Sequence, residues 1–171
     1  KLQIICNNAF YGTSIESISI PSQVTEIGEF TFAKCGQLYK IEFATDSKLQ
    51  IIDKAAFNSS SIESISIPSH VTEIREFAFA NCWQLYKIEF AKDSKLQVIG
   101  KRAFKYSSIE SISIPSQVTQ ILKCAFSECY QLQIIEIDEK SQLKQIYQNI
   151  FEGIIDTIIM IPVQLNISIK Y

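Results

Sequence analysis

The feature that most constrains this chain of 171 residues is a repeat with a period of 47 residues. The four prolines stand 47 positions apart, at Pro21, Pro68, Pro115 and Pro162. The segment Ile-Glu-Ser-Ile-Ser-Ile-Pro-Ser occurs at residues 15–22, 62–69 and 109–116. A repeat of fixed period indicates supersecondary units that stack, because one unit cannot bury its apolar face alone.

Each 47-residue block divides into two units of about 23 residues, which carry Ile-x-x-Ile-x-Ile-Pro and Leu-x-x-Ile-x-Phe/Ile in alternation. Apolar and polar residues alternate in both, which is the pattern of a strand with one buried face. We therefore expect parallel strands stacked about 4.8 Å apart. A phenylalanine accompanies each unit and is expected in the core: Phe10, Phe32, Phe57, Phe79, Phe104, Phe126 and Phe151.

The predicted fold is thus an α/β solenoid with one domain over residues 1–171. Its blocks are residues 2–48, 49–95 and 96–142, with 143–171 as a partial or capping block. Helical turns are expected at residues 29–33 and 76–80. In the last block residues 154–162 align with a seventh strand, and residues 165–169 are expected to add an edge strand. Two interpretations of this end stay open: a cap, or a surface that a neighbouring segment once covered.

The residues also resemble a known family. The pattern Val-Thr-x-Ile-Gly/Arg-x-x-Ala/Thr-Phe-x-x-Cys-x-x-Leu-x-x-Ile-x-Phe, alternating with Ile-x-Ile-Pro, is similar to the BspA-like leucine-rich repeat over roughly residues 2–162. The resemblance implies a right-handed leucine-rich-repeat superhelix of about seven rungs, with a concave parallel sheet and short helical or irregular convex segments. It also implies a cell-surface or secreted adhesin of mucosal bacteria or protist parasites, which binds host-cell or extracellular-matrix proteins.

Composition argues against several functions. The net charge is −2, so the basic footprint of a nucleic-acid binder is missing. The longest apolar stretches are four residues, far short of the ~20 of a spanning helix. Residues 1–5 lack the form of a signal peptide, which favours an unusual export route or a segment of a longer chain. One histidine and five glycines make most metal sites, histidine-based mechanisms and phosphate loops hard to build. Acidic residues fall in columns of similar environment, so we expect no enzyme and no cofactor.

The five cysteines are expected to be free thiols, with one disulfide or a metal site as the less favoured alternatives. Cys35, Cys82 and Cys129 share a column and lie two rungs, or ~9.6 Å, apart. A disulfide needs Cα atoms within about 7 Å. Cys124 replaces a phenylalanine of its column and is expected to fill the core. His70 stands where other blocks have glutamine and is expected to be a solvated turn residue.

The open face of the sheet is the expected binding surface. Units with Ile-x-x-Ile-x-Ile-Pro are called odd rungs here, and units with Leu-x-x-Ile-x-Phe/Ile even rungs. Alternation places serines outward on the odd rungs, at Ser17, Ser19, Ser64, Ser66, Ser111 and Ser113. On the even rungs it places outward Lys40, Glu42, Lys87, Glu89, Ile134 and Glu136. The candidate protein-binding residues are Tyr39, Lys40, Glu42, Trp83, Tyr86, Lys87 and Glu89. The alternative is that these polar residues merely keep the sheet soluble, and that Trp83 packs locally instead of binding a partner.

Two weak glycosylation signals stand at Asn58 and Asn166, and Asn58 is expected to be exposed. Two other functions stay open beside the adhesin. The first is an intracellular interaction scaffold. The second is a self-associating segment of a larger surface protein, which exposed Ile134, Ile158 and Met160 at the C-terminal end would favour.

Overall fold

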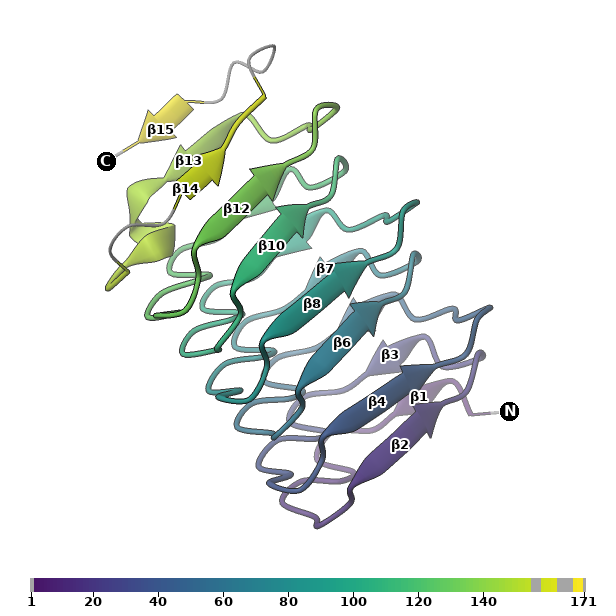
Figure 1. The fold of residues 1–171 in the computed structure, drawn as a ribbon. Helices are drawn as coiled ribbons and strands as arrows, with labels where there is room; N and C mark the ends of the chain where they lie inside the picture. Colours follow the sequence, from purple (N-terminus) through teal and green to yellow (C-terminus); the bar gives the residue numbers. More distant parts are fainter. Residues whose placement is uncertain (1, 155–157, 163–167, 171) are drawn as a thin grey trace.

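The structure is a computed structural model that describes residues 2–154, 158–162 and 168–170. Its chain winds between two layers of short parallel strands, one in front of the other in Figure 1. The front layer contains β2 (Ser17–Ile20), β4 (Lys40–Phe43), β6 (Ser64–Ile67), β8 (Lys87–Phe90), β10 (Ser111–Ile114), β12 (Ile134–Ile137) and β14 (Ile158–Met160). The back layer contains β1 (Ile4–Ile5), β3 (Glu26–Ile27), β5 (Ile51–Ile52), β7 (Glu73–Ile74), β9 (Val98–Ile99), β11 (Gln120–Ile121), β13 (Gln145–Tyr147) and β15 (Ser168–Lys170).

The front strands pair in parallel with the register that the repeat predicts. Ile18 faces Ile41 and Ser19 faces Glu42 between β2 and β4, and the same pairing recurs one block later between β6 and β8. The ladders β2–β4, β6–β8 and β10–β12–β14 are separate sheets, whereas the odd-numbered strands β1, β3, β5, β7, β9 and β11 form one six-stranded sheet behind them. The predicted solenoid of about seven rungs is confirmed. The back layer of strands was not predicted, since two-residue strands leave no visible alternation.

The phenylalanine column forms the centre of the core between the layers. Successive rings stack nearly parallel with centroids 5.1–5.5 Å apart from Phe10 to Phe126, and 6.3 Å apart at the last step to Phe151. The five inner rings have no exposed surface, whereas Phe10 and Phe151 are partly buried at the ends of the stack. Each ring therefore takes its packing from both neighbouring rungs, which makes the column a continuous apolar support for the fold.

The helical turns expected at residues 29–33 and 76–80 are wrong. Both segments are chains of tight turns, and among the described residues the one helical element is the short 3-10 helix η1 (Gln148–Phe151). The Phe32 N–H donates to the Ala56 carbonyl of the next rung at 2.7 Å, instead of to a residue one turn back. Alternate N–H groups in these segments therefore donate to the next rung, as in strands, while those between them form local turns such as Ala33 N–H to the Phe30 carbonyl, so a continuous helix does not form.

Left-handed backbone makes these turns possible. Phe30 has φ of 54° and Lys34 has φ of 58°, and the same two positions recur in the following rungs. The residues concerned are Asn8, Ala55, Ser59, Phe77, Asn81, Arg102, Tyr106, Cys124 and Glu128, with Gly12 and Gly153 at the ends. Such values disfavour a helix and are costly for residues other than glycine. The hydrogen bonds between rungs compensate for this strain.

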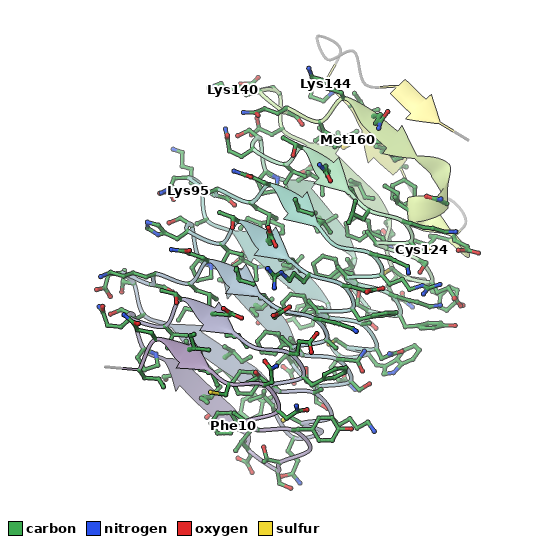
Figure 2. All side chains as sticks on the ribbon, turned by 180° about the vertical axis from the view of Figure 1, so that it is seen from behind. Phe10, Lys95, Cys124, Lys140, Lys144 and Met160 are labelled. Carbon is green, nitrogen blue, oxygen red and sulfur yellow. The ribbon has the colours of Figure 1, made fainter. Side chains whose placement is uncertain are left out.

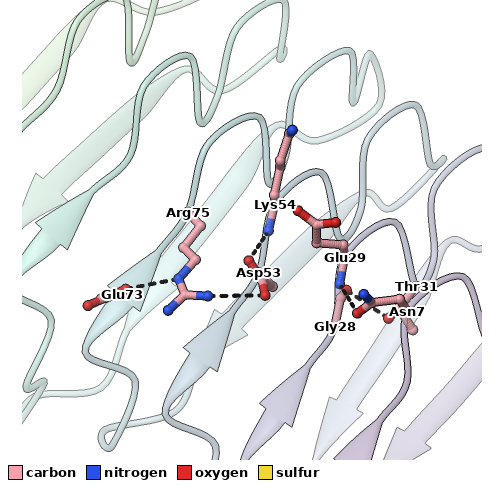
Figure 3. A network of polar contacts seen from close by, with 8 residues as sticks. All are labelled: Asn7, Gly28, Glu29, Thr31, Asp53, Lys54, Glu73 and Arg75. Carbon is pink, nitrogen blue, oxygen red and sulfur yellow. Dashed lines mark hydrogen bonds and ion pairs between the residues drawn. The ribbon is translucent and has the colours of Figure 1, made fainter.

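Polar contacts join neighbouring rungs on the back layer (Figure 3). The Arg75 guanidinium donates from Nη1 to Asp53 Oδ2 at 3.1 Å and from Nε to Glu73 Oε2 at 3.0 Å. Nearer the N-terminus, the Asn7 Oδ1 accepts a hydrogen bond from the Glu29 N–H at 2.9 Å. Arg75 is half-exposed, so these ion pairs contribute modestly to stability and mainly fix the register of the rungs.

The front strands begin at one edge of the solenoid, here called the amino edge, and end at the opposite carboxyl edge. In Figure 2 Cys124 lies on the amino edge, whereas Lys95 and Lys140 project from loops of the carboxyl edge. Loops that follow even-rung strands, such as residues 44–50 after β4, are two residues longer than those that follow odd-rung strands, such as 21–25 after β2. The carboxyl edge therefore carries a longer loop at every second rung.

The C-terminal end follows the predicted pattern in part. β14 is the predicted seventh strand and pairs with β12. The expected last strand at 165–169 begins outside the described residues, and the described β15 covers Ser168–Lys170 and pairs with β13 of the back layer.

Candidate protein-binding surface

The outward positions of the front layer are exposed as the alternation predicts. In β4 and β8 the Lys and Glu side chains are exposed and the isoleucine between them is buried, and the serines of odd rungs are exposed too. Ile134 differs from the expectation. It is half-buried, since β14 lies beside it and pairs it with Ile158, which remains 62% exposed together with Met160 at 51%.

Each even rung of the first two blocks holds an ion pair along the strand. Lys40 Nζ lies 2.7 Å from Glu42 Oε1, and Lys87 Nζ lies 2.8 Å from Glu89 Oε1. The neighbouring odd rung adds a serine, since Ser19 Oγ donates to Glu42 Oε2 at 3.3 Å. Because strand positions two apart point to the same face, the pair is a direct consequence of Lys-Ile-Glu in the sequence. The front layer therefore presents the same charged unit twice.

The third block retains the serine and the glutamate of this unit but not the lysine. Ser113 Oγ donates to Glu136 Oε2 at 2.6 Å, as the equivalent serines do in earlier blocks. Ile134 stands where Lys40 and Lys87 stand, so this rung lacks the lysine of the ion pair. The charged array therefore ends before the C-terminal rungs.

The ion pairs shift the protonation of both partners. The hydrogen bond to Glu42 is the largest cause that raises the pKa of Lys40 above its ordinary value, and the same bond lowers the pKa of Glu42. Lys87 and Glu89 behave identically, the pKa of the first being raised and that of the second lowered. The side chains of both pairs are more than half exposed, so they are charged at neutral pH and available to a partner at little cost in stability.

Tyrosines flank these pairs on the amino edge. Tyr39 and Tyr86 are 47% and 49% exposed, as predicted, while the leucine that precedes each one is fully buried. Their backbone is held from both sides: the Tyr39 N–H donates to the Glu16 backbone carbonyl at 3.0 Å, and the Tyr39 carbonyl accepts from the Glu63 N–H at 3.2 Å. Each exposed phenol is therefore carried by a fixed backbone, which lowers the entropy lost when a partner orders it.

Trp83 lies in an aromatic cluster on the amino edge. The indole is 56% exposed, and its centroid lies 5.2 Å from that of Tyr106, which in turn lies 6.3 Å from that of Tyr130. The Tyr130 hydroxyl donates to Glu128 Oε2 at 2.8 Å. Trp83 is therefore both exposed and locally packed. Sequence analysis missed Tyr106 and Tyr130, although both stand within four residues of the phenylalanine column.

All five cysteines are free thiols. Cys6 is exposed and the other four are buried. The column members donate to backbone carbonyls of the preceding rung, as in Cys82 Sγ to the Phe57 carbonyl at 3.0 Å. Burial raises the pKa of Cys82 to about 12 and that of Cys129 to about 11. Cys124 is buried as predicted, and its thiol donates to Glu152 Oε2 at 3.1 Å.

Two other predicted positions have mixed outcomes. His70 is exposed in its turn, as expected. Asn58 is half-buried instead of exposed, because it lies in the tight-turn segment, where its carbonyl accepts a hydrogen bond from the Lys34 N–H at 2.8 Å. Asn166 lies outside the described residues.

The described residues contain no group of three or more histidine, cysteine or acidic side chains placed to hold a metal ion. In the same part of the chain no helix has the length and apolarity to cross a membrane.

These features define a leucine-rich-repeat solenoid, a class that generally serves as a non-enzymatic binding scaffold. The BspA type leucine rich repeat region matches the sequence in six copies, over residues 3–133 and 97–170. The chain therefore belongs to the BspA-type leucine-rich-repeat family. Among proteins with curated functions, none matches this chain with significant similarity.

Solved structures of bacterial proteins share the fold. The T. pallidum leucine rich repeat protein is 26% identical with a TM-score of 0.64, covering 98% of this chain and 67% of that one. A leucine rich cell surface protein from Faecalibacterium prausnitzii is 25% identical with a TM-score of 0.57, covering 82% of this chain and 44% of that one. A leucine-rich repeat protein from Bacteroides ovatus is 25% identical with a TM-score of 0.59, covering 98% and 43%. The chain thus spans less than half the length of the last two proteins.

Proposed function

We propose that this segment is the recognition part of a cell-surface adhesin, which binds a host-cell or extracellular-matrix protein through the amino side of its front layer. The observation that carries the proposal is the duplicated unit of an exposed tyrosine beside an exposed Lys–Glu pair. It stands at Tyr39, Lys40 and Glu42 and again at Tyr86, Lys87 and Glu89. The surface location is supported by the similar F. prausnitzii protein, which is described as a cell surface protein.

The even rungs are better suited to recognition than the odd rungs. Serine side chains on the odd rungs are short and bury little area, whereas a tyrosine ring offers apolar area and a hydroxyl at low entropic cost. Two identical units two rungs apart engage a partner twice, so modest contacts add up. Trp83 lies beside the second unit and extends the surface along the amino edge.

Kinetics of binding separate the roles of these residues. The segment is titrated against purified extracellular-matrix proteins and intact host cells while association and dissociation are followed. Tyr39→Ala with Tyr86→Ala should speed dissociation about tenfold, because aromatic anchors determine the lifetime of a complex. Lys40→Glu with Lys87→Glu should mainly slow association and change its salt dependence, because exposed charges steer the encounter.

Two controls accompany this experiment. Ser17→Ala with Ser64→Ala changes exposed odd-rung positions and should leave both rates unaltered. Asn58→Asp changes the tight-turn segment away from the front layer and should do the same. Parent-like binding by both even-rung variants, together with failure of Trp83→Ala alone, would place the site on the aromatic cluster and overturn this proposal.

Self-association is the second candidate function. Ile158 and Met160 are large apolar side chains that are more than half exposed on the last front strand. A second copy that covered them would remove apolar area from water. Light scattering should then give a mass above that of one chain, and Ile158→Lys should restore the single-chain mass. A single-chain mass for the parent at high concentration would exclude this candidate.

A further inference from the structure

A groove lies at the carboxyl edge of the front layer, away from the tyrosines of the amino edge. It runs along the carboxyl edge from Phe43 in β4 to Pro162 after β14, across successive rungs. The ends of the front strands form its floor. The longer loops of even rungs, residues 44–48, 91–94 and 138–139, form one wall. Lys87 and Glu89 of the surface proposed above also line this groove, but Tyr39, Tyr86 and Trp83 do not, so the two surfaces adjoin and differ in their aromatic residues.

The floor of the groove is apolar and periodic. Phe43 and Phe90 occupy the register positions that pair with Ile20 and Ile67, but the two isoleucines are fully buried and the two phenylalanines are half-buried. Pro68, from the odd rung between them, is half-buried in the same groove. The groove therefore shows partly exposed aromatic rings on two successive even rungs, with a proline between them, while the third even rung has the buried Ile137 at this position.

The period of this floor matches one particular backbone conformation. Two strand spacings amount to ~9.6 Å. A polyproline II segment has three residues per turn and rises about 3.1 Å per residue, so equivalent residues recur every ~9.3 Å. Two residues three positions apart in such a segment, laid along the groove, would meet the Phe43 and Phe90 rings. Aromatic-lined grooves are the usual receptors for this conformation, because it is preformed and binds at low entropic cost.

The charge of the lining selects among such segments. Six carboxylates line the groove against three lysines. The carboxylates belong to Asp46, Glu89, Asp93, Glu136, Asp138 and Glu139, and the lysines are Lys48, Lys87 and Lys92. Two of these charges, Lys87 and Glu89, satisfy each other. The remaining excess is acidic, so a segment with arginine or lysine between its prolines is complementary.

We propose that this groove binds a basic, proline-rich segment of a partner protein in the polyproline II conformation, running across the rungs with a proline at every third position. Strand addition is a poor alternative here, because the groove crosses successive rungs, so a segment in it runs across the front strands and cannot pair alongside one of them. An amphipathic helix repeats every ~10.5 Å over seven residues, near the same period, and is the competing occupant that the test must exclude.

Fluorescence anisotropy with three labelled basic peptides of equal length and charge tests the proposal. One has proline at every third position, one has proline at every fourth position, and one forms an amphipathic helix. The three-residue repeat should bind about tenfold more tightly than the four-residue repeat, which falls out of step with the rungs. Equal binding of the two proline peptides, or tighter binding of the helical peptide, would overturn the proposal.

Two pairs of variants locate the peptide. Phe43→Ile with Phe90→Ile introduces the residue that the third block already has at Ile137, so the fold is expected to persist. Loss of the two aromatic contacts should weaken the three-residue repeat about three- to tenfold. Asp46→Asn with Asp93→Asn should weaken it and flatten its salt dependence. Unchanged affinity in both pairs would place the peptide elsewhere and contradict the proposal.

A third pair separates this groove from the surface proposed as the adhesin site. Tyr39→Ala with Tyr86→Ala should leave the affinity for the three-residue repeat unchanged, because neither tyrosine lines the groove. Loss of peptide binding in this pair would show that the peptide lies on the amino side, and the groove would then not be its site.

Discussion

The Trp83 indole lies 5.2 Å from the Tyr106 ring, centroid to centroid, although the two residues belong to successive rungs. The contact is reinforced by the backbone, since the Ser108 hydroxyl donates to the Trp83 carbonyl at 2.6 Å. A tryptophan that is fixed in this way and still more than half exposed offers a partner a large surface that needs little ordering. Local packing and partner binding are therefore compatible roles at this position.

The first prediction concerns the phenylalanine column. Phe79 is fully buried and stacks on Phe57 at 5.1 Å and on Phe104 at 5.4 Å. Phe79→Ala should lower the free energy of unfolding by about 3–5 kcal/mol, because it leaves a cavity in the core. His70→Ala, in an exposed turn of the same block, should change it by less than ~0.5 kcal/mol. Urea unfolding of both variants makes the comparison. Similar losses in the two would contradict the central role of the stack.

The core and the front layer were predictable because the repeat makes every position a column with several independent examples. Ile18 and Ile41 show the same alternation as their equivalents, so their burial and register follow from the sequence alone. The tight-turn segments were not predictable in the same way. Phe30 adopts left-handed backbone because hydrogen bonds to the next rung compensate for the strain, and such bonds leave no trace in local sequence.

The candidate site, too, could be predicted from the sequence only in part. Exposure of Tyr39, Lys40 and Glu42 followed from the position of the strand, whereas their ion-pair geometry needed the structure. The groove at the carboxyl edge was missed because Phe43 lies two residues after Ile41, and the alternation therefore places both side chains on the buried face of the strand. The partial exposure of Phe43 is visible only in the structure.

The second prediction concerns thiol reactivity. Cys6 is exposed and the remaining four cysteines are buried. In the native protein one thiol should therefore react rapidly with a disulfide reagent such as DTNB, because reaction requires an accessible thiolate. After unfolding without reductant, the count should rise to close to five. A count of three or fewer in the unfolded protein would reveal disulfides, and several fast thiols in the native protein would contradict the burial of the cysteine column.

The third prediction is a loss of stability at alkaline pH. The pKa of Cys82 is about 12 in the folded protein and near its ordinary 9.0 when unfolded. A pKa that is raised by folding stabilises the protein below the unfolded value, and this contribution is lost as pH rises toward the folded value. Between pH 9 and pH 12 the free energy of unfolding should therefore fall as pH rises, by roughly 1 kcal/mol per pH unit for this thiol.

The matched variant for this measurement is Cys82→Ala, which removes the titrating group and leaves the other ionisable residues in place. Its stability should decline less steeply over the same pH range than that of the parent. Parallel pH profiles for the two proteins would show that the buried thiol is not the group responsible.

The fourth prediction uses two glycines with opposite surroundings. A Cβ at Gly100 would lie 2.6 Å from the Arg75 backbone carbon and 2.7 Å from the Ile74 carbonyl oxygen, so the preceding rung would have to move. Gly100→Ala should therefore cost about 1–3 kcal/mol through overpacking. A Cβ at Gly36 would meet nothing within 4 Å, so Gly36→Ala should be neutral or stabilise by up to ~1 kcal/mol through the unfolded state. Thermal unfolding of the two variants compares them directly. A loss at Gly36 as large as that at Gly100 would mean that the spacing between β7 and β9 does not determine the tolerance of these positions.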